Sequence, residues 1–256
     1  MTLLHSKRWQ QALAIAFWAV VWQLAAMALG HDGLFLASPV QTLQALVRLV
    51  PTVEFWRRIA FSAGRILLGF ALAVAVGTLL AAACSRWAVV RLLAQPVLQL
   101  IRAMPVASFV ILVLLWVRSA NLAVVVSFVH VLPVIYAGVL GGIAAADRNL
   151  LEMAQVYRLP FAARLRYIWL PAIFPGLCES CIAAMGMCWK SGVSAEVIGL
   201  PDHSLGDALY RAKITLATPE VFAWTLVIVL LAAGCSAVAT RGLRAAKAKL
   251  CGEATA

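Results

Sequence analysis

The sequence has few charged residues for its length, and acids are the rarer kind. Of its 256 residues, 12% are charged and 64% are hydrophobic, with 10 acids against 21 Lys and Arg. The mean hydropathy is +0.96. Soluble globular proteins contain about 25% charged residues, and about half of their residues are apolar. The composition therefore excludes a soluble globular protein and predicts an integral membrane protein that lies in the lipid bilayer.

A net charge of +11 raises the question of a nucleic-acid partner. The basic residues are scattered between apolar blocks and form no basic stripe, so no nucleic-acid partner is predicted. When alternate loops are assigned to the cytoplasm, 12 of the 21 basic residues lie there with three acids. Because cytoplasmic loops are enriched in Lys and Arg, we predict that both termini and the central loop are cytoplasmic.

Several kinds of site lack the residues that they require. None of the five lysines lies in the Gly-x-x-x-x-Gly-Lys-Ser/Thr pattern that holds nucleotide phosphates. Cys178 and Cys181 form a C-x-x-C pair, but no second pair or nearby His completes a metal site. Asp202 and His203 are adjacent and have no third ligand close by. We predict no catalytic residue, no metal and no cofactor, and we expect the C-x-x-C cysteines to pack between helices.

The apolar runs predict about six membrane-spanning helices, since each span needs about 20 apolar residues. The predicted spans are 11–30, 59–84, 88–117, 121–146, 172–189 and 221–240. We expect one transmembrane domain over 1–256. Residues 1–58 would hold the first span and an interfacial segment on the outer side, 59–240 the core and 241–256 a basic cytoplasmic tail. Within the segment 31–58, the spacing of five apolar residues predicts an amphipathic helix. They are Val40, Leu43, Leu46, Val47 and Val50.

Small residues mark two faces where helices are expected to pack closely. Gly138 and Gly142 are four residues apart in the fourth predicted span. One face of the second span carries four small residues: Gly69, Ala73, Gly77 and Ala81. Such spacing lets helix backbones approach one another in lipid, where no hydrophobic force drives them together.

The second and the fifth predicted spans each contain one charged residue, Arg65 and Glu179. Glu179 is near the middle of the fifth span, where an acid costs about 2.5 to 3.5 kcal/mol. We therefore predict a buried ion pair of Glu179 with Arg65 or with a neighbouring helix. Arg65 lies one turn inside the second span, and its side chain either reaches the interface or an ion-pair partner, or contacts a ligand directly.

The third predicted span, 88–117, is too long for one straight helix and contains Pro96 and Pro105. Each proline removes a backbone hydrogen bond and frees a carbonyl. Broken helices at membrane depth occur where they are buried in protein or line a watery cavity. We predict a broken helix here.

The longest polar interruption runs from Asp147 to Pro175 and contains four arginines, Arg148, Arg158, Arg164 and Arg166. Apolar residues recur within it at three- and four-residue steps, which predicts a short amphipathic helix. They are Leu150, Leu151, Ala154, Tyr157 and Phe161. Pro160 is expected to end this helix, and Leu170-Pro171 to mark the return to the membrane.

Within this interruption, Glu152-Met153-Ala154 followed by Ile168-Trp169-Leu170-Pro171 resembles the "EAA" loop of permease subunits in type I ABC importers. Ser62-x-x-Arg65-x-x-x-Gly69-Phe70 is similar to the sulfonate, nitrate and taurine branch of that family. The resemblance implies an all-α, MetI-like permease fold in a bacterial inner membrane. It further implies a second permease copy, giving a homodimer, two ATPase subunits that bind the ATP, and an extracytoplasmic solute-binding protein.

The resemblance also assigns roles to residues. The loop 147–171 would hold the coupling helix that docks on the ATPase, with Glu152 and Ala154 at the docking face and Arg158 beside it. The coupling residues are Leu151, Glu152, Met153, Ala154, Tyr157 and Arg158. The family has a Gly where this chain has Arg158, and Arg lacks the backbone freedom of Gly.

Two further segments match the family. Residues 95–105 correspond to a segment that lines the translocation path, with four candidates: Gln99, Arg102, Met104 and Pro105. Ala195-Glu196 and Ser204-Leu205-Gly206 resemble elements of the outer side, so Glu196, Leu205 and Gly206 are candidates for an outer gate.

The residues alone leave two other functions open. An ion-coupled secondary transporter would need buried ionisable groups and repeated halves, and no internal repeat is found. A membrane-embedded enzyme would need a clustered catalytic set. The resemblance favours import of a small sulfonate, nitrate, taurine or pyrimidine-like compound.

Overall fold

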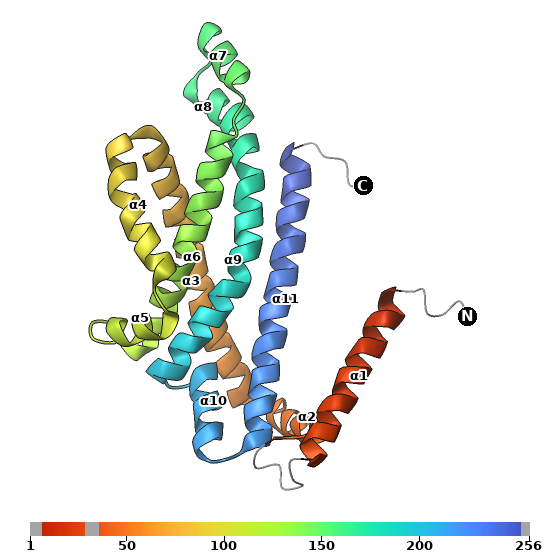
Figure 1. Cartoon of the computed structure of the whole chain (residues 1–256). Helices are drawn as coiled ribbons and strands as arrows, with labels where there is room; N and C mark the ends of the chain where they lie inside the picture. The colour runs from red at the N-terminus through yellow and green to blue at the C-terminus, as the bar shows by residue number, and fades with distance from the viewer. Residues whose placement is uncertain (1–6, 29–35, 252–256) are drawn as a thin grey trace.

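Residues 7–28 and 36–251 are described in the computed structural model, and within them the chain forms helices and connecting turns but no strand (Figure 1). Three predicted segments extend outside this range. They are residues 29–30 of the first span, 31–35 of the interfacial segment and 252–256 of the basic tail.

The first half of the chain holds the helices α1 Lys7–Ala28, α2 Pro39–Leu49, α3 Val53–Arg86, α4 Ala88–Ala103, α5 Val106–Val113 and α6 Ser119–Ala144. The second half holds α7 Arg148–Val156, α8 Phe161–Arg164, a π-helical turn η2 Leu165–Trp169, α9 Leu170–Gly199, α10 Leu205–Ile214 and α11 Thr218–Cys251. The all-α fold class is confirmed.

The core forms where α6 packs between α3 and α9. A Cβ on Gly69 would lie 2.5 Å from the Val124 carbonyl oxygen, and one on Gly142 would lie 2.8 Å from the Ile173 Cα. These helices can approach so closely only because their contact positions carry small residues. The small residues predicted on α3 are all buried, so that prediction is confirmed.

Four helical segments in the described chain are long and apolar enough to cross a membrane: 53–86, 119–144, 161–199 and 218–248. The pair α4 and α5 makes a fifth if it is counted as one broken span. The first of the six predicted spans lies in α1, Lys7–Ala28.

The predicted break in the third span is confirmed, but one proline causes it rather than two. Helices α4 and α5 meet at 110°. Met104 has an extended backbone there, and Pro105 is the N-cap of α5. Pro96 lies inside α4, which continues through it.

Three spans are longer than their apolar runs indicated, and one of them is α11, which continues past the predicted end at Thr240 to Cys251. Helix α3 begins at Val53, so the predicted interfacial segment ends before it, and α9 continues past the predicted end at Trp189 to Gly199. Residues of the predicted outer segment from Lys190 therefore belong to α9. The physical reason lies in the buried polar contacts of Glu196, which are described below.

Helix α2 lies against α11 at the end of the bundle opposite α7, hereafter the far end (Figure 1). Ser38 and Gln41 form a capping box at its start. The predicted amphipathic helix is confirmed. Of its five predicted apolar residues, Leu46 packs against the core, and Val40, Leu43, Val47 and Val50 are exposed.

Candidate functional site

Helix α7 projects beyond the ends of α6 and α9, at one end of the molecule (Figure 1). Asp147 is its N-cap: its carboxylate accepts a hydrogen bond of 2.8 Å from the Asn149 N–H. The helix ends at Val156, four residues before Pro160. The predicted short helix is present, but Pro160 instead precedes α8 as its N-cap.

Large apolar side chains are exposed on this projecting loop. Their exposed fractions are 42% for Leu150, 46% for Met153, 78% for Val156, 74% for Tyr157 and 72% for Phe161. We call these five residues the α7 patch. Unlike the exposed apolar residues of α3 or α11, the first four do not lie on a helix long enough to cross a membrane, and Phe161 is the first residue of the segment 161–199. An exposed apolar cluster outside the spans is typical of a protein contact surface.

The other predicted coupling residues divide into exposed and buried ones. Glu152 and Arg158 are exposed, and Leu151 is half-buried. Ala154 is completely buried, and its carbonyl oxygen accepts a hydrogen bond of 3.0 Å from the Leu159 N–H. The expectation that Ala154 itself lies at a docking face is therefore wrong. Its small side chain instead allows α7 to pack against the residues that follow it.

Arg158 adopts a left-handed backbone conformation with φ of 49°. This conformation costs a residue with a Cβ roughly 1 to 2 kcal/mol, and Gly adopts it freely. The turn that follows α7 thus keeps the geometry that Gly favours, although Arg occupies the position. Hydrogen bonds hold it there: the Arg158 N–H donates to the Gln155 carbonyl at 3.0 Å, next to the Leu159 bond.

The chain returns from this loop through a π-helical turn. In η2 the Leu170 N–H donates to the Leu165 carbonyl, five residues earlier, directly before Pro171. The helices α8, η2 and α9 form one continuous segment, 161–199. The helical return therefore starts nine residues before Leu170-Pro171, the point that the sequence indicated.

At the far end, Glu196 of α9 is completely buried and joins three helices. Its Oε2 accepts hydrogen bonds from the Ser62 hydroxyl of α3 at 2.7 Å and from the Gly206 N–H of α10 at 3.2 Å. The Ser62 Oγ in turn accepts a bond of 2.9 Å from the Leu205 N–H. We call these four residues the Glu196 cluster. A buried carboxylate needs such donors because burial without them is costly.

The structure thus brings together the three predicted outer-gate residues. Their partner Ser62 was part of a family motif in the sequence, but the sequence did not predict that it would join them. A Cβ on Gly206 would lie 2.4 Å from the Glu196 Cβ, so no larger residue fits there. Ser204, which stands where the family has a Gly, is the N-cap of α10 and accepts a hydrogen bond of 3.0 Å from the Asp207 N–H.

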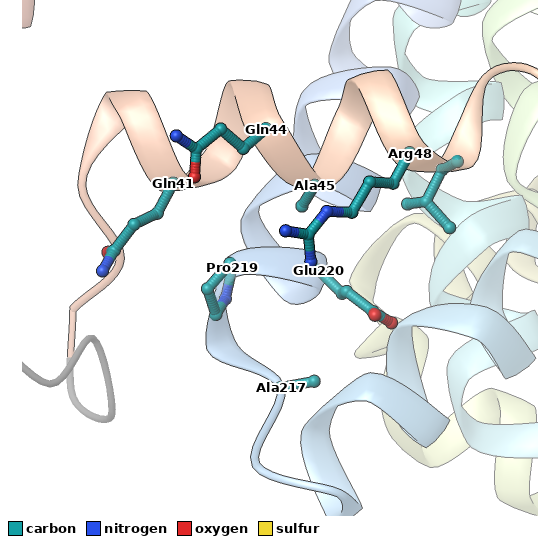
Figure 2. A pocket seen from close by; sticks show the side chains of 8 residues that line it. Gln41, Gln44, Ala45, Arg48, Ala217, Pro219 and Glu220 are labelled. Carbon is teal, nitrogen blue, oxygen red and sulfur yellow. The ribbon is translucent and has the colours of Figure 1, made fainter.

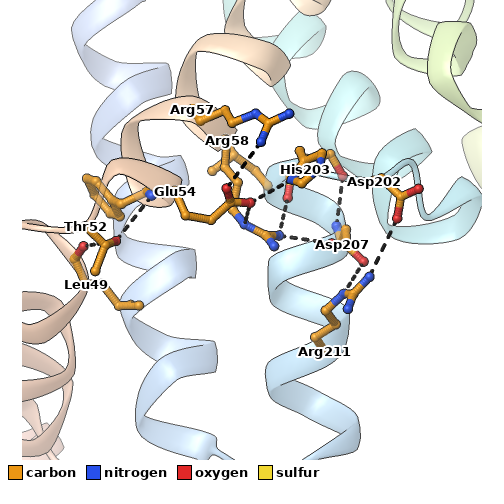
Figure 3. A network of polar contacts seen from close by, with 12 residues as sticks. Leu49, Thr52, Glu54, Arg57, Arg58, Asp202, His203, Asp207 and Arg211 are labelled. Atoms are coloured by element: carbon orange, nitrogen blue, oxygen red, sulfur yellow. Dashed lines mark hydrogen bonds and ion pairs between the residues drawn. The ribbon is translucent and has the colours of Figure 1, made fainter.

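A network of charged side chains lies beside this cluster (Figure 3). Arg58 contacts Glu54 and Asp207, each at 3.0 Å, and so ties the start of α3 to α10. Arg211 also contacts Asp207, at 2.7 Å, and this carboxylate raises the pKa of the Arg211 guanidinium. His203 Nδ1 lies 2.8 Å from Glu54. The sequence shows that these charged residues flank apolar runs. It does not show that Arg58 pairs with Asp207, or Glu54 with His203, because the members of each pair are 149 positions apart.

Asp202 and His203 contact different partners. Asp202 lies 3.6 Å from Arg211, whereas His203 contacts Glu54. In the described part of the chain, no group of three or more His, Cys, Asp or Glu is arranged to hold a metal ion.

The four candidates for the translocation path lie at the end of α4 and at the bend. Gln99, Arg102 and Pro105 are exposed, and Met104 is half-buried. Arg102 Nη2 donates a hydrogen bond of 2.7 Å to the Pro133 carbonyl of α6. The structure therefore anchors Arg102 against the core helix and leaves Gln99 facing outward from this chain.

The predicted ion pair of Arg65 and Glu179 does not form. Arg65 donates to the Ala120 carbonyl and lies over the Phe61 ring, with 3.6 Å from its guanidinium carbon to the ring centre. Glu179 is exposed on α9, and the described residues provide it with no ion pair.

Residues 73–249 match the family described as "Binding-protein-dependent transport system inner membrane component". The chain belongs to this family. Its permease members are transport subunits of ABC importers in the inner membrane, so the chain is a multi-pass membrane permease and not itself an enzyme. The expected recognition as a type I ABC importer permease of the sulfonate and taurine branch is confirmed.

Three relatives illustrate the likeness. The aliphatic sulfonates transport permease protein SsuC of Escherichia coli is 29% identical, over 84% of this chain and 83% of the relative. The taurine transport system permease protein TauC of Escherichia coli is 26% identical over 90% of this permease and 89% of the relative. In the crystal structure of an amino acid ABC transporter with histidines, one chain is similar with a TM-score of 0.60 and 19% identity. That match covers 81% of this chain and 98% of the other, and shows the fold.

Proposed function

We propose that the chain forms the translocation path of an importer for a small sulfonate-like anion and is driven by a separate ATPase that docks on the α7 patch. The family membership supports the role as a permease. The observation that carries the coupling is the exposed apolar α7 patch on a loop that projects beyond the spanning helices.

The docking face comprises the α7 patch with the exposed charges of Glu152 and Arg158 at its edge. Such a surface fits an amphipathic helix inserted in a groove, where apolar side chains supply affinity and charges set the orientation. Ala154 is buried under this face, and its carbonyl accepts the hydrogen bond from the Leu159 N–H that stabilises the loop. Arg158 fixes the turn, and Leu151 packs between the exposed face and the loop.

In the proposed mechanism, the α7 helices and the spanning helices move together as rigid bodies. Two copies of the permease, two ATPase subunits and an extracytoplasmic binding protein form the working importer. ATP binding brings the ATPases together and moves the two α7 helices with them, which rocks the spanning helices as rigid bodies. In this arrangement α7 and both termini face the cytoplasm, and the far end faces outward.

The Glu196 cluster and the Arg58 network act as the outer gate. They tie α3, α9 and α10 together where the path meets the outer side. Buried charge-assisted hydrogen bonds of this kind have defined geometry and favour discrete arrangements over gradual deformation.

The solute is a small organic anion of the sulfonate class. The names of the two Escherichia coli relatives support this class. The cationic Arg102, anchored on the Pro133 carbonyl, supplies a positive charge on the path. Selection among sulfonates lies with the binding protein.

The test replaces one exposed residue of the α7 patch by an acid. In Tyr157→Glu, a charge takes the place of a 74% exposed aromatic side chain at the docking face. Ile214→Glu on α10 is the matched control, since Ile214 is 61% exposed at the far end. We expect about a tenfold or greater loss of ATP-dependent uptake and of ATPase co-purification in Tyr157→Glu, because contact hot spots contribute about 2 kcal/mol.

The control is expected to retain ATPase binding, and both variants should melt at the same temperature as the wild type. Normal uptake in Tyr157→Glu would contradict the proposed docking face. Undiminished accumulation after deletion of the ATPase gene would instead favour an ion-coupled carrier.

A further inference from the structure

A pocket with two glutamines and two charged side chains in its lining lies between α2 and the first turn of α11 at the far end (Figure 2). Its volume is about 230 Å³, far more than one water molecule needs. Gln41, Gln44 and Arg48 line it from α2, and Pro219 and Glu220 line it from α11. It is separate from the Glu196 cluster, since no residue is shared between them.

Three faces follow one another around α2, because successive residues turn by about 100°. The buried face holds Thr42 and Ala45 against the bundle. The pocket face holds Gln41, Gln44 and Arg48, at steps of three and four residues. The third face is apolar and exposed, and its residues are Val40, Leu43, Val47 and Val50. The polar and apolar outer faces are therefore adjacent along the whole helix.

The pocket holds one cationic and one anionic side chain. Arg48 lies in the last turn of α2 and Glu220 in the first turn of α11, where each complements the dipole of its own helix. The packing of α2 against α11 places both on one pocket. In the part of the chain that the structure describes, no ion pair joins them. Both charges are therefore available to a ligand of matching charges.

We propose that this pocket binds a zwitterionic group that carries a phosphate or sulfonate oxyanion and a primary ammonium, with the headgroup of phosphatidylethanolamine as its source. The Arg48 guanidinium donates to the oxyanion, and the Glu220 carboxylate accepts from the ammonium. Gln41 and Gln44 offer amide groups along the same wall.

The adjacent apolar face favours a lipid over a free zwitterion. A headgroup in the pocket places its acyl chains along the exposed Val40, Leu43 and Val47, as expected of an amphipathic helix at a membrane interface. A free compound would leave that face without a role. The pocket also lies at the ends of the spanning helices, where headgroups are found.

The experiment uses the full chain purified from vesicles that contain equal amounts of phosphatidylethanolamine, phosphatidylcholine and phosphatidylglycerol. Native mass spectrometry counts the lipids retained by each protein. We expect the wild type to retain phosphatidylethanolamine in preference to the other two. Arg48→Gln should lower its retention about tenfold, because a charge-assisted hydrogen bond is lost. Glu220→Gln should abolish the preference for phosphatidylethanolamine over phosphatidylglycerol, which has no ammonium.

Lys213→Gln is the matched control, since Lys213 is an exposed cation on α10 outside the pocket. Equal loss in this control would overturn the site, as would unchanged lipid retention in both pocket variants. A second arm adds free phosphoethanolamine to the delipidated protein. Saturable binding of that compound, with no retained lipid, would assign the pocket to a free zwitterion and refute the lipid source. Variants that retain lipid but lose stimulation by the binding protein would show a protein contact instead.

Discussion

Replacing Gly206 with Ala tests how tightly the far end is built. The new Cβ would lie 2.4 Å from the Cβ of Glu196, so α10 must move by about 1 Å to reach a normal contact of 3.4 Å. That movement stretches the hydrogen bond from the Gly206 N–H to Glu196, now 3.2 Å, beyond a useful length. Overpacking costs about 1 to 3 kcal/mol and the lost bond to a charged group about 1.5 kcal/mol.

The sum is about 2.5 to 4.5 kcal/mol, which lowers the melting temperature of a chain of this size by roughly 5 to 18 °C. Thermal unfolding of the detergent-purified permease, followed by fluorescence, measures this shift. Gly64→Ala on α3 is the control, because a Cβ there meets nothing within 4 Å. If Gly206→Ala melts at the same temperature as Gly64→Ala, the reasoning about the Glu196 cluster is wrong.

Three further predictions use the same melting assay. Arg158→Gly is expected to raise the melting temperature by a few degrees, since relief of about 1 to 2 kcal/mol of left-handed strain exceeds the added flexibility of the unfolded chain, whereas Arg158→Val should lower it. Ser62→Ala should cost about 1 to 3 kcal/mol because the Leu205 N–H loses its acceptor, and a normal melting temperature would contradict this. Asp207→Asn and Arg58→Gln should be non-additive, with a coupling energy of about 0.5 to 3 kcal/mol in a double-mutant cycle, and additive effects would show that the pair contributes nothing.

The spanning helices were predictable because lipid imposes a length of about 20 apolar residues on each of them. Their ends were less predictable. Polar residues interrupt the apolar run of α9 after Trp189, yet the helix continues to Gly199, and Ser62 and Gly206 donate hydrogen bonds to the Oε2 atom of Glu196. A hydropathy pattern shows that an acid is unfavourable in a spanning helix. It does not show which residues donate hydrogen bonds to that acid in the folded protein.

The local turns show the same limit. The Gly preference of a left-handed turn made Arg158 look unsuitable, and the structure keeps that conformation with Arg in place. Conversely, the expected partner of Glu179 was chosen from the few charges in the spans, and Arg65 contacts the Ala120 carbonyl instead. Charge alone does not determine pairing when a backbone carbonyl of a neighbouring helix competes as an acceptor.

One helical segment connects the α7 patch with the Glu196 cluster at the far end. The segment 161–199 is continuous through α8, η2 and α9, so Phe161 of the α7 patch and Glu196 of the far-end cluster lie on one helix. At 1.5 Å per residue, roughly 50 Å separates them. A π-helical turn near the α7 end departs from the regular hydrogen-bond pattern directly before Pro171. In the proposed importer, a push at α7 would be transmitted along this segment to the hydrogen bonds that Glu196 makes with α3 and α10.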